Sequence, residues 1–197
     1  MTAGAHPTRR IGVLALQGAV SEHASMLSAL GAEPVLVRRP EQLDGLDALV
    51  VPGGESSAVA RMAARVDLLP AVRGCIDAGM PVLGTCAGLI LLAERVVDAG
   101  ALDGFDRIGG LDVTVRRNGY GGQLASFEAD VELDTASMHV AFIRAPIIEH
   151  VGADARVLAT HDSRPVAVQQ ARVLAAAFHP EITGVDRLHR MLLSLID

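Results

Sequence analysis

The chain has 197 residues, half of them apolar, which is enough to bury one sizeable core and too short for two comfortable domains. The formal net charge is -6 and the arginine pairs are scattered, so there is no basic stripe for a phosphate backbone. Four Phe, one Tyr and no Trp leave few aromatic rings on which bases could stack, and we expect no nucleic-acid partner. Two cysteines are too few for a disulfide framework, and the apolar run after the polar leader, residues 1–10, is too short to span a membrane. We therefore expect a cytoplasmic protein with no membrane partner and one domain over residues 11–197.

Strands alternate with helices in the first half of the chain. The expected strands are 11–16, 34–37, 48–51 and 81–85, and the expected helices are 21–30, 57–65, 68–77 and 87–96. This alternation indicates a doubly wound, mostly parallel sheet flanked by helices, with ligand sites beyond the carboxyl ends of the strands.

After Gly100 the chain becomes richer in strands. The expected strands are 111–117, 126–133, 140–144, 156–160, 166–169 and 173–178, followed by a helix over 185–196. Because no linker precedes them, we expect these strands to extend the same sheet. The predicted fold class is a single-domain α/β protein with a strand-rich C-terminal half.

The segment Gly84-Thr85-Cys86-Ala87-Gly88 is a G-x-C-x-G elbow between an expected strand and an expected helix. The glycines permit a tight, strained turn that lifts the thiol above the sheet, and the helix N-terminus favours the thiolate. Cys86 is therefore a candidate nucleophile. A buried structural cysteine is the commoner role of an intracellular thiol, and we assign that role to Cys75.

The segment His179-Pro180-Glu181 follows the expected strand 173–178 and so lies on the same rim as Cys86. Pro180 favours an extended conformation at His179, and residues two apart in an extended chain point the same way. Glu181 can then fix the tautomer of the imidazole. The chain order Cys, His, Glu differs from the Ser, Asp, His order of hydrolases with a similar elbow, which disfavours an ordinary esterase.

The segment Pro52-Gly53-Gly54-Glu55-Ser56-Ser57 follows a third strand and opens a helix. Its backbone N–H groups can point at a developing oxyanion, and the two glycines permit close approach. Without the other two segments, we would interpret it as an ordinary strand-to-helix turn with a serine cap.

These residues resemble the class I, triad-type glutamine amidotransferases, and within them the glutaminase subunits of pyridoxal 5'-phosphate synthases. The resemblance runs nearly end to end and is carried by residues 11–18, 52–56, 84–93, 117–118, 142–146 and 178–181. The elbow and His-Pro-Glu are shared across the class. The narrower group is indicated by the first stretch, residues 11–18, by the Glu-Ser after Gly-Gly and by Phe-Ile-Arg-Ala-Pro.

The resemblance implies that Cys86 attacks the amide carbon of L-glutamine, that His179 moves protons and that Glu181 orients His179. It places the oxyanion hole at backbone N–H groups of Gly54 and Ala87. It implies a glutamine site made by Gly54, Glu55, Ser56, Arg117, Ile143 and Arg144. The carboxylate of Glu55 suits the substrate ammonium, and an arginine suits its carboxylate. The chain has no P-loop, HExxH or G-x-G-x-x-G motif, and we expect no metal and no cofactor.

The resemblance also implies a partner. In this group the glutaminase docks on a barrel-shaped synthase subunit in a hetero-oligomer, and the partner completes the oxyanion hole, with Gln17 and its loop taking part. The chain departs from the group in its polar leader and at Gly119-Tyr120-Gly121-Gly122, where a serine, an aromatic and a basic residue are expected around the glycine.

Two alternatives stay open on the residues alone. One is a glutaminase subunit serving another synthase, such as those of histidine or anthranilate biosynthesis, because the same triad would serve there. The other is a non-catalytic, redox-sensing thiol protein of related fold, in which Cys86 is a reactive thiol.

Overall fold

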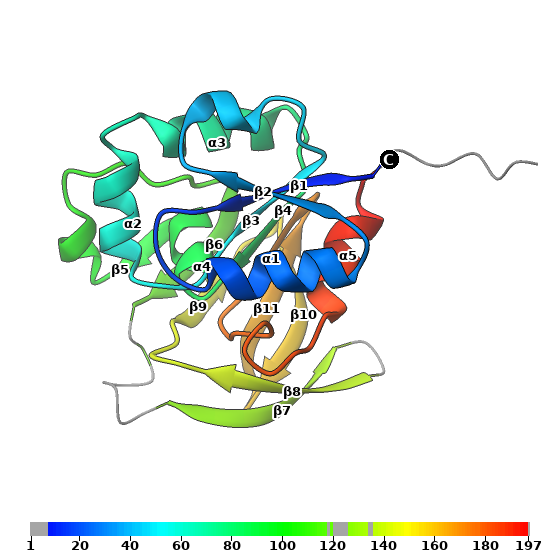
Figure 1. Ribbon diagram of the computed structural model, residues 1–197. Coiled ribbons are helices and arrows are strands. Elements are labelled where there is room, and N and C mark those ends of the chain that lie inside the picture. The colour runs from blue at the N-terminus through cyan, green and yellow to red at the C-terminus, as the bar shows by residue number, and fades with distance from the viewer. Residues whose placement is uncertain (1–7, 118, 120–125, 134–135, 197) are drawn as a thin grey trace, which may run out of the picture.

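In the computed structural model, the described residues are 8–117, 119, 126–133 and 136–196, and they form one α/β unit (Figure 1). The strands are β1 Arg10–Leu14, β2 Glu33–Val37, β3 Ala48–Val51, β4 Val82–Thr85, β5 Ala93–Val97, β6 Leu111–Arg116, β7 Phe127–Leu133, β8 Ala136–Phe142, β9 Ile147–Val151, β10 Arg156–His161, β11 Arg164–Gln170 and β12 Val173–Ala176. The helices are α1 Val20–Ala29, α2 Ser56–Ala63, α3 Leu68–Asp77, α4 Ala87–Leu92 and α5 Arg187–Ser194, with short 3₁₀ turns at Pro40–Leu43 and Ala99–Leu102.

The central part of the main sheet is parallel. Its strand order is β2-β1-β3-β4-β12, and the strands β3 and β12 are buried along their whole length. Burial on both faces explains why these strands read as unbroken apolar runs instead of alternating ones. Parallel pairing brings the carboxyl ends of β1, β3, β4 and β12 to one edge of the sheet.

The same sheet continues in antiparallel pairing through β11, β10, β7 and β8. The strands β7 and β8 pair from Phe127 opposite Phe142 to Leu133 opposite Ala136, and they form the outer edge at the bottom of the view in Figure 1. The rings of Phe127 and Phe142 stack with centroids 4.8 Å apart. The sequence prediction of an α/β sheet with a strand-rich second half is confirmed.

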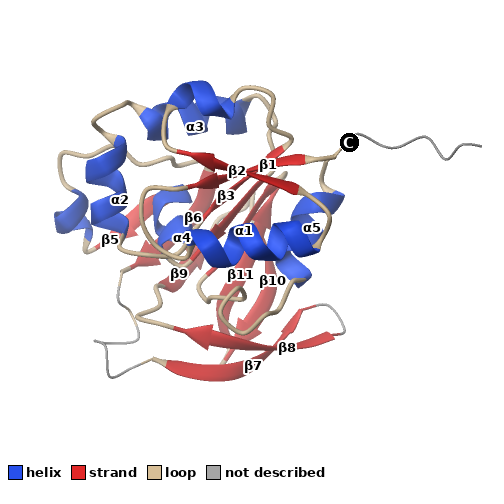
Figure 2. Ribbon diagram, viewed as in Figure 1, coloured by secondary structure: helices blue, strands red, loops and turns tan. Residues whose placement is uncertain are grey.

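Helices lie on both sides of the parallel strands (Figure 2). The helices α1 and α5 lie side by side on one face, and α2 and α3 lie on the other. The helix α5 buries Leu188 and Leu192 and leaves Arg190 exposed, which is the amphipathic pattern expected of a helix covering a sheet. Among the residues described, no helix is long and apolar enough to cross a membrane.

One prediction of the topology is wrong. The strands β5, β6 and β9 form a separate three-stranded sheet instead of extending the main one. The helix expected over 87–96 ends at Leu92, where Ala93 turns extended and begins β5. The β-branched pair Val96 and Val97 pairs with β6 there, so tertiary pairing overrides the helical spacing.

Smaller differences concern boundaries. The strand expected at 140–144 is Ala136–Phe142, because its alternating residues pair with β7, and Arg144 at φ 46° lies beyond its end. The strand β9 was not expected. The strand β1 begins at Arg10, one residue inside the expected leader, while residues 1–7 lie outside the described part of the chain. The other predicted elements agree within about two residues at each end.

Candidate active site

Cys86 lies at the elbow between β4 and α4. Its backbone has φ 47° and ψ -99°, its N–H donates to the carbonyl of Ala176 at 2.8 Å, and its side chain is buried. A positive φ at a non-glycine residue costs on the order of 1–3 kcal/mol and persists only where the surroundings enforce it. Gly88 lets the first turn of α4 pack this closely against β3, because a Cβ there would collide with the carbonyl oxygen of Val51. The elbow predicted from the sequence is present.

His179 lies just beyond the end of β12, where its N–H donates to the carbonyl of Ala141 on β8 at 2.8 Å. Its Nδ1 is 2.7 Å from Oε1 of Glu181, and both side chains are buried. The predicted contact between residues two apart is therefore present. It leaves the other ring nitrogen of His179 available to Cys86.

The charge state of His179 is set by competing influences. Burial lowers its pKa, but hydrogen bonds to Cys86 and Glu181 and the charges of these two groups together raise the pKa to about 10. An imidazolium at this position stabilises a thiolate beside it. The sulfur Sγ of Cys86 also lies 3.8 Å from the carbonyl oxygen of Ile143.

Gly53 brings the end of β3 to the same place. A Cβ on Gly53 would collide with the ring of His179 and lie 3.2 Å from the Cβ of Cys86. Its N–H donates to Oγ1 of Thr85 at 3.0 Å, which ties this turn to the elbow. The three segments that the sequence singled out therefore meet at one edge of the sheet, as expected for ends of parallel strands.

A cavity of about 100 Å³ lies over Cys86 and His179. Besides Cys86 and His179, Ile90 lines it, and so do all six residues expected to bind glutamine: Gly54, Glu55, Ser56, Arg117, Ile143 and Arg144. Ile90 was not anticipated, although its position four residues after Cys86 puts it on the same face of α4. Ala87 is buried and does not line the cavity.

Two charged residues of this cavity are paired with each other. Oε1 of Glu55 accepts from Nη2 of Arg117 at 3.2 Å, and from the N–H and hydroxyl of Ser57 at 3.3 and 3.1 Å. The side chain of Arg117 is 10% exposed and that of Glu55 is 42% exposed. The carboxylate is therefore fixed in place and still open to a ligand.

Gln17 lies on the loop between β1 and α1 and contacts the same turn. Its Oε1 accepts from the N–H of Glu55 at 2.6 Å, and a Cβ on Gly54 would collide with it. The first loop therefore touches the backbone for which we expected an oxyanion role. Residues 120–122, which belong to the stretch where the sequence departs from the family pattern, lie outside the described residues, as does Asn118.

Two buried histidines close to Glu181 were missed by the sequence predictions. His23 on α1 and His189 on α5 are fully buried, and Nδ1 of His23 is 2.8 Å from Nε2 of His189. Burial, and then the neighbouring His189 and His179, lower the pKa of His23 well below its ordinary value. Burial lowers the pKa of His189 to about 4, although Asp186 opposes the shift. The available signal was position, since His23 lies one turn before Leu27 on the buried face of α1.

Acidification should destabilise the fold through these histidines. A histidine with a lowered pKa in the folded state contributes stability above its unfolded pKa of about 6.5, which is lost as pH falls towards its folded pKa. Between pH 7 and pH 5, His189 should account for up to about 2 kcal/mol of unfolding free energy. Denaturant unfolding at both pH values should show a smaller loss in His189→Gln than in the parent. The exposed His150→Gln is the control, and an equal loss in all three proteins would contradict the prediction.

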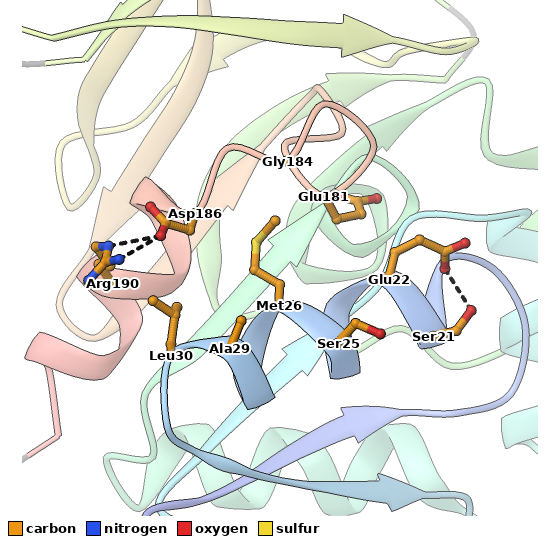
Figure 3. A pocket seen from close by; sticks show the side chains of 10 residues that line it. All are labelled: Ser21, Glu22, Ser25, Met26, Ala29, Leu30, Glu181, Gly184, Asp186 and Arg190. Atoms are coloured by element: carbon orange, nitrogen blue, oxygen red, sulfur yellow. Dashed lines mark hydrogen bonds and ion pairs between the residues drawn. The ribbon is translucent and has the colours of Figure 1, made fainter.

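A larger cavity of about 560 Å³ lies between α1 and α5 (Figure 3). Side chains of α1 such as Met26 face the loop that carries Glu181 and Gly184, and Arg190 pairs with Asp186 at its far side. Its lining contains neither Cys86 nor His179, so size alone does not locate the chemistry. Glu181 lines this cavity together with residues of α1, so its side chain lies between the two cavities' linings.

Comparisons with known proteins identify the fold and the family. The fold is that of the glutamine amidotransferases: a crystal structure described as glutamine amidotransferase matches with a TM-score of 0.88 and 44% identity, over 94% of this chain and 98% of that one. A more distant match, the structure of PurLQS from Thermotoga maritima, has a TM-score of 0.66 at 17% identity, covers 96% of this chain and 99% of that one, and supports the fold alone.

The chain belongs to the SNO glutamine amidotransferase family, whose model matches residues 13–196. A relative from Leifsonia xyli subsp. xyli, described as pyridoxal 5'-phosphate synthase subunit PdxT, is 52% identical over 93% of this chain and 94% of its own length. A protein of the same description from Frankia alni is 50% identical, over 95% of this chain and 94% of its own.

Proposed function

We propose that this chain is a glutaminase that hydrolyses L-glutamine to L-glutamate and ammonia and delivers the ammonia to a pyridoxal 5'-phosphate synthase subunit. The observation that carries the proposal is the meeting of Cys86, His179 and Glu181 at one rim, beneath a small cavity with a fixed carboxylate and an arginine. The names of the relatives supply the expected synthase.

The first half-reaction forms a thioester. The thiolate of Cys86 attacks the side-chain amide carbon of glutamine, and the carbonyl electrons move to the oxygen. The protonated imidazole of His179 gives its proton to the amide nitrogen, the C–N bond breaks and ammonia leaves. Glu181 holds Nδ1 of His179 and stabilises its positive charge, which keeps the other ring nitrogen directed at the reacting atoms.

The second half-reaction releases glutamate. The neutral imidazole of His179 takes a proton from water, the resulting hydroxide adds to the thioester carbon, and the C–S bond breaks to restore the thiolate. In both steps the oxyanion needs donors, and we assign these to backbone N–H groups of Gly54 and Ala87. The contact of Gln17 with the N–H of Glu55 makes the first loop a place where a docked partner can adjust that backbone.

Glutamine recognition is assigned to the charged pair in the cavity. The carboxylate of Glu55 accepts hydrogen bonds from the substrate ammonium, and the guanidinium of Arg117 or Arg144 donates hydrogen bonds to the substrate carboxylate. Gly54, Ser56 and Ile143 complete the walls. Glu55 can bind the substrate ammonium and keep its hydrogen bond from Arg117 at the same time, because a carboxylate oxygen accepts more than one hydrogen bond.

Replacing Glu55 with glutamine should therefore raise the KM for glutamine by about tenfold, since a hydrogen bond to a charged group contributes roughly 1.5 kcal/mol or more. The kcat should change much less, because the ammonium lies away from the reacting carbon. Steady-state glutamate release measures both constants. The matched control is Glu33→Gln, at the exposed start of β2 and thus at the opposite edge of the sheet. A change in kcat with no change in KM would contradict this role for Glu55.

The whole proposal is tested by measuring glutamate release from purified chain, alone and mixed with the barrel-shaped subunit of a pyridoxal 5'-phosphate synthase. Stimulation by that partner supports both the chemistry and the pathway. Equal turnover with and without it keeps the triad and assigns the chain to another synthase. Absence of turnover in both mixtures contradicts the proposal.

A further inference from the structure

The second carboxylate oxygen of Glu181 is the starting point. Oε1 contacts His179, whereas Oε2 is buried and has no hydrogen-bond partner among the described residues. A buried carboxylate oxygen without a donor is costly, so a donor group close to it would stabilise the site. Nε2 of His23 lies 3.5 Å from this oxygen, and both side chains are fully buried.

His23 is held at both of its ring nitrogens. Its Nδ1 lies 2.8 Å from Nε2 of His189, and its Nε2 lies 3.1 Å from Oγ1 of Thr85. Thr85 directly precedes Cys86, and its Oγ1 also accepts the N–H of Gly53. One histidine of α1 is therefore connected to α5, to the elbow and to the carboxylate of the triad.

The tautomers of His23 and His189 follow from the one ring nitrogen of the pair that has no hydrogen-bond partner. Nδ1 of His189 is buried and has no partner among the residues that the structure describes. If Nδ1 of His23 donated to Nε2 of His189, the single proton of the neutral His189 would lie on its own Nδ1, as a buried N–H without an acceptor. The opposite arrangement leaves only a lone pair there, and a buried orphan donor is the rarer and less favourable case. Nε2–H of His189 therefore donates to Nδ1 of His23.

With Nδ1 of His23 accepting, its proton must be on Nε2. That N–H faces Thr85 Oγ1 at 3.1 Å and Glu181 Oε2 at 3.5 Å. Both histidines are neutral at pH 7, since burial is the main cause that lowers their pKa values. The arrangement thus supplies a neutral N–H donor to a carboxylate whose other oxygen is bonded to His179.

We propose that His23 is a positioning residue of the triad: its Nε2–H holds the free oxygen of Glu181, and His189 fixes the tautomer that makes this possible. The chain of contacts then runs from His189 through His23, Glu181 and His179 to Cys86. Catalytic hydrogen bonds are often long before the reacting complex forms and tighten in it, so a contact of 3.5 Å is compatible with this role. The kinetic part of this inference rests on the proposed glutaminase function.

The first test does not depend on turnover. The chain labelled with ¹⁵N-histidine is examined at pH 7 by long-range ¹H–¹⁵N correlation, and His23→Gln and His189→Gln assign the signals. We expect the nitrogens of both His23 and His189 to show the neutral Nε2–H pattern. The Nδ1–H pattern or an imidazolium at His23 would overturn the proposal.

The second test measures glutamate release by the complex with the synthase subunit. His23→Leu should lower kcat by ~10-fold to ~100-fold with little change in KM, the range seen when an outer hydrogen-bond partner is removed. His23→Gln, which offers an N–H from a similar position, should recover most of that loss. Equal losses in the leucine and glutamine variants, or no loss in either, would count against His23 as a donor.

A double-mutant cycle separates positioning from packing. If His23 acts through Glu181, then His23→Leu should cost almost nothing further in a Glu181→Gln background, and additive losses would overturn the proposal. The matched control is Leu27→Val, one turn further on the same buried face of α1, which should keep kcat within about twofold. A kcat loss in this control equal to that of His23→Leu would assign the effect to helix packing.

Failure of this inference is distinguishable from failure of the proposed function. Should the parent complex release no glutamate, the glutaminase assignment fails while the tautomers still test the contacts. Alkylation of Cys86 by iodoacetamide then replaces turnover as the readout, in a Cys75→Ser background. His23→Leu should slow it and His23→Gln should restore it, and identical rates in the parent and His23→Leu would overturn the positioning role.

Discussion

Cys86→Ala is expected to reduce partner-stimulated glutamate release by ~10⁴-fold or more, which is the scale seen when a covalent nucleophile is removed. Thr85 cannot replace the thiolate, because its hydroxyl lies against the N–H of Gly53 and His23 and does not line the cavity. The fold should persist, since alanine removes one sulfur and leaves in place the contacts that enforce the elbow.

The measurement is glutamate release by the complex. Thermal unfolding checks the fold of the variant, and co-purification with the synthase checks docking. The control is Cys75→Ser, on α3 and outside the cavity lining, which should keep full turnover. Substantial turnover by Cys86→Ala, or its loss in Cys75→Ser, would remove the assignment of the nucleophile.

His179→Asn should reduce kcat by ~10³-fold to ~10⁴-fold, because it removes both the proton donor and the charge beside the thiol. The pKa of His179 is raised to about 10 by hydrogen bonds and charges of Cys86 and Glu181, which outweigh burial. Its proton is therefore retained at neutral pH. The stability that the protonated imidazole contributes is fully present below its unfolded pKa of about 6.5 and is lost as pH rises through about 10.

The same variant should slow alkylation of Cys86 by iodoacetamide between pH 6 and pH 9, measured in a Cys75→Ser background. His139→Asn is the control, because His139 is also paired with carboxylates but lies exposed on β8, outside the cavity. Alkylation that proceeds at the same rate in His179→Asn would show that the imidazolium does not hold the thiolate.

Local signals predicted the site better than they predicted the sheet. Three features of the site each depend on a short segment at a strand end, so the sequence was enough to predict them. They are the elbow at Cys86, the contact of His179 with Glu181 and the turn at Gly53. The strand β5 could not be predicted from its own residues, because its extended conformation depends on pairing with β6, about twenty residues away along the chain.

The buried histidines illustrate the other limit. His23 and His189 lie 166 residues apart and meet only because α1 and α5 pack side by side. Nothing in either helix marks its histidine as different from an apolar residue of the buried face. Likewise, the pairing of Glu55 with Arg117 joins a helix cap to the end of β6, and sequence could suggest each charge but not their contact.

The position of β12 has a consequence for synthesis of the protein. This strand lies between β4 and β11 at the middle of the main sheet, yet it is the last strand in the chain. The pairing of β12 with β4 joins segments about ninety residues apart, and such long-range closure is slow. Because His179 and Glu181 follow β12 directly, a growing chain on the ribosome is expected to release no ammonia until residues 173–181 have emerged and inserted.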